Sequence, residues 1–502
     1  MPLPTREAGA LRLTELLEGE TEIVAGAASI ANTNITGLTA DSRLVEPGYL
    51  FAALPGASAD GRAFITDAVN RGAVAVLAPP GTEPAGLAAG EGRVPMIADP
   101  QPRRRFALMA ARFFARQPET VVAVTGTNGK TSVAGFVRQI WAAAGRRAAS
   151  LGTLGLVAPD RVEAGNLTTP DPVRLHRLLR ELADDAVDSV AMEASSHGLD
   201  QFRLDGVRVA AAAFTNLTRD HLDYHGTFAA YRAAKLRLFS ELLAADGTAV
   251  IHADSPEAPA FAAAAAEHGV PTLSVGRAGA DIRLLATEPT AEGQRLTILV
   301  DGRERSLTLP LAGGFQADNA LVALGLALAT GVEVDVAVDA LSRLEGMPGR
   351  LQRVARLANG ASVYVDYAHT PDALESVLAA LRPHTTGRLE VVFGCGGDRD
   401  SGKRAPMGRV AARLADHVIV TDDNPRTEDA AAIRRQVLAG CPEAVEIGDR
   451  AQAIEAAVAG LDSGDLLVVA GKGHETGQIV GDRVLPFDDA TAVRAAVEGG
   501  GR

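Results

Sequence analysis

The chain has 502 residues, which is more than one domain usually holds, so two to four domains are expected. Its hydrophobic fraction of 47% and charged fraction of 22% are typical of globular proteins, and no apolar run approaches the ~18 residues of a membrane span. A net charge of −13 argues against nucleic acid or an anionic membrane surface as the main partner. Because the N-terminus lacks an apolar signal core, a cytoplasmic location is expected, and two cysteines cannot form a disulfide framework.

The first hundred residues predict a small α/β unit. Residues 40–54 read as a turn and a strand, 63–72 as a helix and 73–79 as a buried strand. A Pro- and Gly-rich stretch, 78–92, precedes a linker that leads into a helix, so a domain boundary is expected near residue 100.

The remaining chain alternates β-branched runs with helical Ala/Leu/Arg stretches, the pattern of α/β domains with mainly parallel sheets. A central section opens with the strand TVVAVT, contains two helices at 313–331 and 333–346, and ends at a Pro-Gly break in MPGR. The last section contains four apolar strands, each running into a polar or glycine-rich loop. These segments are 361–370, 388–400, 417–426 and 465–475. Ligands bind at such carboxyl-end loops in open parallel sheets, so this section is expected to be functional.

Lysine is rare in this chain. Of 49 basic residues only four are lysines, Lys130, Lys235, Lys403 and Lys472. Arginine serves wherever a generic cation suffices, so lysine indicates a compact charge or an amine that can lose its proton. Each of the four lies in a motif.

The strongest local signal is the strand Val121–Thr125 followed by Gly126-Thr127-Asn128-Gly129-Lys130-Thr131-Ser132 and a helix. Backbone amides of such a loop cradle phosphates, Lys130 would reach the β- and γ-phosphates, and Thr131 would ligate Mg²⁺. The spacing departs from the usual phosphate loop because Val124 stands at the first glycine position. A tight strand-to-helix turn is the alternative, but strand, loop, Lys-Thr and helix all occur in order.

Two further stretches contain possible metal ligands. Glu193, in MEASSHG, ends a strand of the same predicted sheet and is placed to hold Mg²⁺, although strand-end glutamates often form caps or surface ion pairs. The stretch 215–226 concentrates histidines, aspartates and an asparagine, with His221 as a candidate ligand and Lys235 one helix further on. A solvated loop with helix caps is the alternative.

The chain resembles the Mur ligase family, the ATP-dependent amide-forming enzymes of peptidoglycan precursor synthesis. The resemblance covers nearly the whole chain and rests on ten motifs in order: DSR at 41–43, GTNGKT at 126–131, TTP at 168–170, MEASSHGL at 192–199, NLTRDHLDYHG at 216–226, YRAAK at 231–235, MPGR at 347–350, DYAHTPD at 366–372, DNPR at 423–426 and GKGHE at 471–475. It implies three α/β domains: an N-terminal UDP-substrate-binding domain (1–100), a central P-loop-type parallel-sheet ATPase domain (101–348) and a C-terminal Rossmann-like amino-acid-binding domain (349–502).

The resemblance also implies roles for individual residues. ATP would be held by the phosphate loop together with Asn319, Arg350 and Asp366. Two Mg²⁺ ions would be held by Thr131, Glu193, His221 and an N-carboxylated Lys235, and Lys130, Glu193, His221 and Lys235 would form the catalytic set. The uridine end would contact Ser42, Ala57, Ser58 and Ala59, and the muramoyl dipeptide Thr168, Thr169, Ser195, Gln201 and Arg203. The incoming amino acid would contact Arg399, Asp423, Asn424, Pro425, Arg426, Gly471 and Glu475. Leu167 stands where many members have asparagine, so Asn166 is left out of the site.

The DNPR motif matches the members that add meso-2,6-diaminopimelate rather than L-lysine. An arginine fork pairs a carboxylate bidentately, which suits the distal carboxylate of that amino acid. The resemblance therefore implies a monomeric ligase that adds meso-diaminopimelate to UDP-N-acetylmuramoyl-L-Ala-D-Glu through an acyl phosphate. The alternatives are a lysine-adding or folate-glutamylating ligase of the same fold, or, in another class, a nucleotide-dependent switch ATPase.

Overall fold

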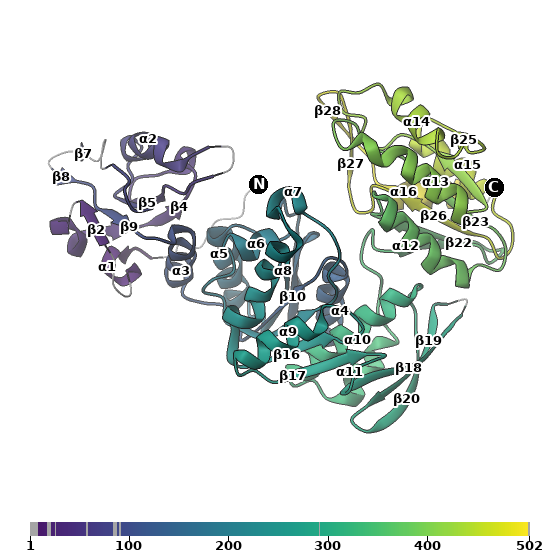
Figure 1. The fold of residues 1–502 in the computed structure, drawn as a ribbon, viewed down its shortest axis with the longest axis horizontal. Helices are drawn as coiled ribbons and strands as arrows, with labels where there is room; N and C mark the ends of the chain where they lie inside the picture. The colour runs from purple at the N-terminus through teal and green to yellow at the C-terminus, as the bar shows by residue number, and fades with distance from the viewer. Residues whose placement is uncertain are drawn as a thin grey trace. The chain divides into compact units, whose positions relative to one another are not determined.

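The computed structural model describes residues 9–17, 22–25, 27–56, 59–83, 88–89, 92–290 and 292–499. The chain packs as two compact units, residues 1–130, 145–251 and 255–272 in the first, and 131–144, 252–254 and 273–502 in the second. Three α/β sheets follow one another along the chain, as the sequence predicts (Figure 1). None of the helices in these described ranges is both long enough and apolar enough to cross a bilayer.

The N-terminal sheet of the first unit has the strand order β2-β9-β6-β5-β4. Strands β4, β5, β6 and β9 are parallel neighbours, and β2 closes the edge antiparallel. Successive residues of β5 face opposite cores: Leu50 packs with α3 and Phe51 with α2. The elements are β1 (Leu11–Arg12), α1 (Leu13–Leu16), β2 (Glu22–Ala25), β3 (Asn34–Ile35), β4 (Gly37–Thr39), β5 (Tyr49–Ala52), α2 (Ile65–Asn70), β6 (Ala75–Ala78), β7 (Ala88–Ala89), β8 (Gly92–Arg93), β9 (Met96–Ala98) and α3 (Pro102–Phe114).

The second sheet of the first unit is built around β10, which pairs in parallel with β14 on one side and β15 on the other. Their carboxyl ends therefore meet at one edge, where Val124 lies beside Glu193. Helix α5 buries an apolar stripe against this sheet. The elements are β10 (Thr120–Thr125), β11 (Ala148–Gly152), β12 (Gly155–Val157), β13 (Val162–Glu163), α5 (Pro172–Asp184), β14 (Ser189–Glu193), α6 (Ser196–Asp200), β15 (Val209–Phe214), α7 (Leu222–His225), α8 (Phe228–Arg237), a π-helical turn (Leu238–Leu242), β16 (Leu243–His252) and α9 (Ala258–Glu267).

The second unit begins with helix α4 and an antiparallel meander, β18-β19-β20. The Trp141 indole of α4 donates to Thr330 Oγ1 at 3.0 Å, at the end of the apolar helix α10. The elements are α4 (Lys130–Ala143), β17 (Thr272–Gly276), β18 (Ile282–Pro289), β19 (Gln294–Val300), β20 (Arg303–Leu309), α10 (Gly314–Ala329) and α11 (Val334–Leu341).

The C-terminal sheet has the order β21-β22-β26-β23-β24-β25, parallel except at β21. Its central strands are largely apolar because helices cover both faces: along β23, Val391 packs with α12–α14 and Val392 with α15 and α16. The elements are β21 (Gln352–Arg356), β22 (Ser362–Asp366), α12 (Pro371–Leu381), β23 (Leu389–Phe393), α13 (Arg404–Leu414), β24 (His417–Val420), α14 (Ala430–Leu438), β25 (Val445–Glu446), α15 (Arg450–Ala459), β26 (Leu466–Ala470), β27 (Gly477–Val480), β28 (Arg483–Pro486) and α16 (Asp489–Gly499).

His176 makes the first unit sensitive to acid. Burial on α5 lowers the pKa of its imidazole from 6.5 to about 4, and Nε2 lies 3.2 Å from the Asp205 carbonyl oxygen. The unfolded chain binds this proton more readily than the folded one, so stability is lost as pH falls below about 6.5. We expect the opening free energy of α5, measured by hydrogen exchange, to fall by roughly 1–2 kcal/mol more in the wild type than in His176→Gln between pH 7 and pH 5. Equal pH slopes would contradict this.

Candidate functional site

The phosphate-loop segment leaves the carboxyl end of β10 and enters α4, as predicted. A neighbouring loop holds it in place: the Asn128 amide donates to Asn216 Oδ1 at 3.0 Å, and Thr215 Oγ1 donates to the Asn128 carbonyl at 2.6 Å. Lys130 Nζ folds back over the loop and donates to the carbonyls of Gly126 (2.9 Å) and Thr127 (2.8 Å). Thr131 and Ser132, which follow in the first turn of α4, are buried. The loop therefore adopts a hydrogen-bonded shape that gathers amides and an ammonium group at a strand end, as a phosphate site requires.

Gly126 is required by this close packing. Its φ of +150° is rare for other residues, and a Cβ there would lie 1.9 Å from Thr215 Oγ1. We expect Gly126→Ala to lower the free energy of unfolding by about 2–4 kcal/mol and to weaken nucleotide binding. Gly145 is the matched control, because its φ is +82° but a Cβ there would have open space. Gly145→Ala should cost about 1 kcal/mol; calorimetry and nucleotide titration of both variants give the comparison, and equal losses would refute the packing argument.

Lys235 lies directly beneath the phosphate loop. It is 1% exposed, and its Nζ donates to the Gly126 carbonyl at 2.8 Å. Burial lowers the pKa of this amine well below its ordinary value, and the nearby charge of Lys130 lowers it further. Nζ also stands 4.8 Å from the ring centroid of Tyr231, whose hydroxyl is 3.0 Å from Thr127 Oγ1. Lys235 is therefore a buried amine that loses its proton easily beside a phosphate-binding loop.

His221 approaches the same region from an exposed loop. It has a left-handed φ of +50°, and its ring lies 6.3 Å from Tyr231 and 4.8 Å from His197, centroid to centroid. The backbone conformation and these rings orient the imidazole. His221 and Lys235 thus both approach Tyr231.

Glu193 has a separate set of contacts at the end of β14. Its two carboxylate oxygens accept from the backbone amide and the hydroxyl of Thr153, at 2.8 and 3.1 Å. The carboxylate is 2% exposed, so these bonds offset its loss of hydration. Sequence reasoning missed Thr153, because nothing local marks a threonine in a loop as the partner of a carboxylate forty residues away.

A chain of hydrogen bonds joins the residues predicted to hold the dipeptide. Ser195 Oγ donates to Thr169 Oγ1 at 3.0 Å, and Thr169 Oγ1 donates to the Glu193 carbonyl at 2.9 Å. Arg203 donates to the Thr169 carbonyl at 2.7 Å and to Gln201 at 2.7 Å. Thr168 reaches Thr153, with 3.1 Å between their hydroxyls. The structure therefore brings this predicted group together.

The predicted uridine contacts lie in the N-terminal sheet. Ser42, 7% exposed, begins a 3₁₀ helix after β4, and Ala59 follows β5 with its carbonyl accepting from Gly56. Because β4 and β5 are parallel, both residues follow the same edge of that sheet. Ala57 and Ser58 lie outside the described residues.

The predicted nucleoside contacts of the second unit are linked through Gln316. Asn319 donates to Gln316 Oε1 at 3.1 Å, and Gln316 donates to the Arg350 carbonyl at 3.0 Å. The Asp366 carboxylate accepts from the amides of Leu351 (2.6 Å) and Ala368 (2.8 Å). Burial raises the pKa of Asp366 to about 6, against the charge of Arg350. Gln316 and Asp366 thus bond the backbone at Arg350 and Leu351, so all three predicted residues lie around the turn that contains Arg350.

The predicted amino-acid contacts occupy carboxyl-end loops of the C-terminal sheet. Asp423 and Asn424 are buried after β24, while Arg399 is exposed after β23. Arg426 has a left-handed φ of +53° and donates from NH1 to the Gly397 carbonyl at 2.8 Å. Its backbone is held by the β27–β28 hairpin, since its amide donates to Ile479 and its carbonyl accepts from Gly481. Pro425 lies between Asn424 and Arg426, and Gly471 and Glu475 follow β26.

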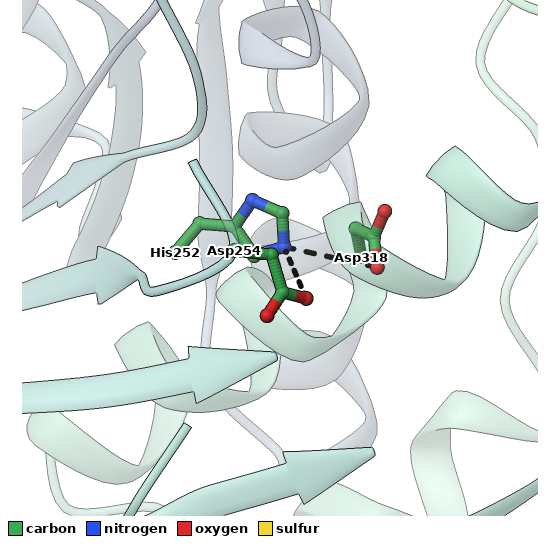
Figure 2. A group of neighbouring side chains, drawn as sticks. All are labelled: His252, Asp254 and Asp318. Carbon is green, nitrogen blue, oxygen red and sulfur yellow. Dashed lines mark ion pairs between the residues drawn. The ribbon is translucent and has the colours of Figure 1, made fainter. Parts of the chain in front are cut away.

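Within the described ranges, His252, Asp254 and Asp318 form one further group of possible metal ligands (Figure 2). His252 Nε2 lies 3.5 Å from Asp254 Oδ2 and 3.7 Å from Asp318 Oδ1. The Asp254 carboxylate also accepts from the backbone amides of Arg277 (2.8 Å) and Ala278 (2.7 Å). Ion pairing and loop capping account for this arrangement, so we assign it no metal.

A strand, a hydrogen-bonded glycine loop and two lysines at one sheet edge form the kind of site that binds nucleotide phosphates in α/β proteins. Family models match the chain in three places: the Mur ligase family catalytic domain at residues 34–114, the Mur ligase middle domain at 124–327 and the Mur ligase glutamate ligase domain at 349–473. The chain belongs to the Mur ligase family.

Among the proteins similar to this chain are ligases that share the same name. A UDP-N-acetylmuramoyl-L-alanyl-D-glutamate–2,6-diaminopimelate ligase from Mesorhizobium japonicum is 56% identical over 475 residues, covering 94% of this chain and 97% of that protein. The ligase of that name from Caulobacter vibrioides is 56% identical over 472 residues, covering 93% of this chain and 96% of that protein.

Solved structures agree with the fold. A structure of a ligase with the same name aligns with a TM-score of 0.74 at 32% identity, covering 98% of this chain and 100% of the other. Folylpolyglutamate synthase from Mycobacterium tuberculosis aligns with a TM-score of 0.61 at 20% identity, covering 80% of this chain and 95% of the other. At that identity the likeness shows a shared fold and nothing more. The predicted three-domain α/β fold is confirmed.

Proposed function

We propose that this chain is an ATP-dependent ligase that joins meso-2,6-diaminopimelate to UDP-N-acetylmuramoyl-L-Ala-D-Glu in peptidoglycan precursor synthesis. The observation that carries the proposal is 56% identity, over 94% of the chain, to a ligase named for these two substrates. Arg426, after β24, is a guanidinium suited to the distal carboxylate of the diamino acid. We assign the uridine end to residues 1–100, ATP to 101–348 and the amino acid to 349–502.

The ATP phosphates would be held by the loop Gly126–Ser132, and the nucleoside by Asn319, Arg350 and Asp366. Thr131, Glu193, His221 and Lys235 would hold two Mg²⁺ ions. Carboxylate and carbamate oxygens are the hard donors that Mg²⁺ prefers, and the lowered pKa of Lys235 suits carbamate formation. Bound there, Mg²⁺ would supply positive charge where a carboxylate approaches a triphosphate.

The reaction consists of two substitutions. The γ-carboxylate of the D-glutamyl residue takes the terminal phosphoryl group of ATP, releasing ADP and giving an acyl phosphate. The neutral amine then attacks the acyl carbon, phosphate leaves, and the amine proton passes to a base. Lys130 offsets the negative charge at the phosphates, and Thr168, Thr169, Ser195, Gln201 and Arg203 orient the acceptor.

Two histidines are candidates for the base, His221 and His369. His221 is also proposed as a Mg²⁺ ligand, which would occupy the nitrogen that a base needs. His369 Nδ1 lies 2.9 Å from the Tyr367 carbonyl, so Nδ1 carries the proton and Nε2 is left to accept one. Partial desolvation lowers the pKa of His369 below its usual value. These contacts favour His369.

Phosphate release from MgATP tests the proposal directly. With UDP-N-acetylmuramoyl-L-Ala-D-Glu present, release should be slow until meso-diaminopimelate is added and much slower with L-lysine. If lysine served equally well, a lysine-adding ligase would be indicated. If neither amine stimulated release, the ligase assignment would fail, and a folate ligase or a nucleotide-dependent switch would replace it.

A further inference from the structure

We propose that Lys472 is a positioning residue that fixes the Asn424 amide and the Glu475 carboxylate for binding of the incoming diamino acid. The inference rests on the proposed function, because Asn424 and Glu475 are assigned to that substrate. Lys472 contacts both residues and is 0% exposed, so it acts through them rather than on the substrate.

The backbone around Lys472 is built to bring it into the interior. Lys472 follows β26 between two glycines with positive φ, Gly471 at +116° and Gly473 at +58°. A Cβ on Gly471 would lie 2.6 Å from Asp423 Oδ2, and one on Gly473 would lie 2.7 Å from Tyr367 Cβ. The chain thus passes close to two neighbouring loops on either side of the lysine, which a larger residue at either position would prevent.

Lys472 fixes which way the Asn424 amide points. Asn424 Oδ1 accepts from Lys472 Nζ at 3.1 Å and from the Ile479 backbone amide at 2.9 Å. Both lone pairs of this oxygen are then used, and Nδ2 is turned toward Glu475 Oε2, to which it donates at 2.9 Å. A flipped amide would place its NH₂ group against an ammonium and an N–H. Lys472 therefore makes Asn424 a donor on the Glu475 side.

The same ammonium holds Glu475. Lys472 Nζ lies 3.2 Å from Glu475 Oε2, and the Glu475 side chain is 36% exposed. One carboxylate oxygen is thus anchored from the buried side by Lys472 and Asn424, while the group keeps a face toward solvent. A carboxylate held in place in this way suits recognition of a substrate ammonium group.

The charges of this region also suit that substrate. Arg450 forms a fully buried, two-bond pair with Asp489, at 2.7 and 2.8 Å. Burial raises the pKa of the Asp423 carboxyl, and the charges of Arg450 and Lys472 oppose that rise. Lys472 bonds the Glu475 carboxylate directly and acts on Asp423 through its charge alone. The Glu475 carboxylate, which keeps a face toward solvent, is then available to an ammonium group of the incoming amino acid. Without Lys472, Glu475 would lose its buried partner, Asp423 a nearby positive charge, and the Asn424 amide its orientation.

Lys472→Met tests the proposal, since methionine keeps much of the side-chain volume and removes the charge. Leaving buried partners unpaired should raise the KM for meso-diaminopimelate about tenfold to a hundredfold. The KM for MgATP and for the UDP substrate should stay unchanged, and kcat should fall by less than about threefold. The double variant Lys472→Met/Glu475→Gln should lose less than the sum of the two single losses, because part of the lysine's effect passes through that carboxylate and the rest through Asn424.

Arg388→Met is the control for simple destabilisation of the same domain. Arg388 bonds Asp465 at 2.8 Å at the amino end of β23, whereas Lys472 follows the carboxyl end of the parallel strand β26. The control should lower Tm without changing any KM. If Lys472→Met lowered Tm in the same way and left the KM for the diamino acid unchanged, its role would be structural and the proposal would fall.

Hydrogen exchange gives a readout that does not depend on activity. The Ile479 amide donates to Asn424 Oδ1, so Lys472→Met should speed its exchange at least about tenfold, and Arg388→Met should not. Unchanged exchange at Ile479 would overturn the positioning role even in an active enzyme. A wild-type protein with no substrate-dependent phosphate release would reject the proposed function, while the exchange comparison would still decide whether Lys472 holds Asn424.

Discussion

Lys235→Ala is expected to lower the turnover of the ligase by about a hundredfold to a thousandfold, and Lys235→Arg to be equally inactive. On the proposed carbamylation, the buried Lys235 amine would add to CO₂ and release a proton, a reaction of the neutral amine that its lowered pKa favours. An arginine keeps its proton in that place and cannot form the carbamate. On this proposal the group lost in either variant is a carboxylate, not an ammonium, so the positive charge of arginine should not restore function.

Chemical rescue separates this role from a structural one. Short carboxylic acids or bicarbonate should partly restore Lys235→Ala but not Lys235→Arg, and ¹³C-bicarbonate should produce a carbamate resonance in the wild type alone. Arg232→Ala is the control on the same helix, because Arg232 is partly exposed and pairs with Glu257 at 3.1 Å. An active Lys235→Arg variant would contradict the carbamate hypothesis.

Local patterns were sufficient to predict much of the fold. The strand, glycine loop and helix around Gly126 follow from a buried β-branched run and residues that permit the turn, all within a dozen positions. The four C-terminal strands are likewise apolar segments that end in loops, and each is a strand in the structure. Parallel pairing then places their loops at one edge, which explains why motifs far apart in sequence share a site.

Contacts between loops could not be predicted in this way. The bonds from Thr153 to Glu193, and from Gln316 to Arg350, join residues whose sequence neighbours give no sign of the partner. The clearest missed signal is Lys472, one of four lysines and flanked by glycines, yet given no role by the motif alone. Its contacts with Asn424 and Glu475 depend on how β24 and β26 place their loops, which composition and periodicity do not specify.

Arg426→Ala is expected to lower kcat/KM for meso-diaminopimelate by about a hundredfold and to leave the value for L-lysine nearly unchanged, so that the preference between them largely disappears. The left-handed Arg426 backbone is clamped by Ile479 and Gly481, and NH1 donates to the Gly397 carbonyl, so little side-chain freedom is lost when a carboxylate binds. L-lysine lacks the distal carboxylate and cannot use this fork. Arg426→Lys should recover only part of the loss, because a point charge replaces a bidentate donor.

Arg435→Ala, which changes an exposed arginine on α14, is the control. A preference for diaminopimelate that survived in Arg426→Ala would mean that another group reads the distal carboxylate, and exposed Arg399, after β23, would be the next residue to test.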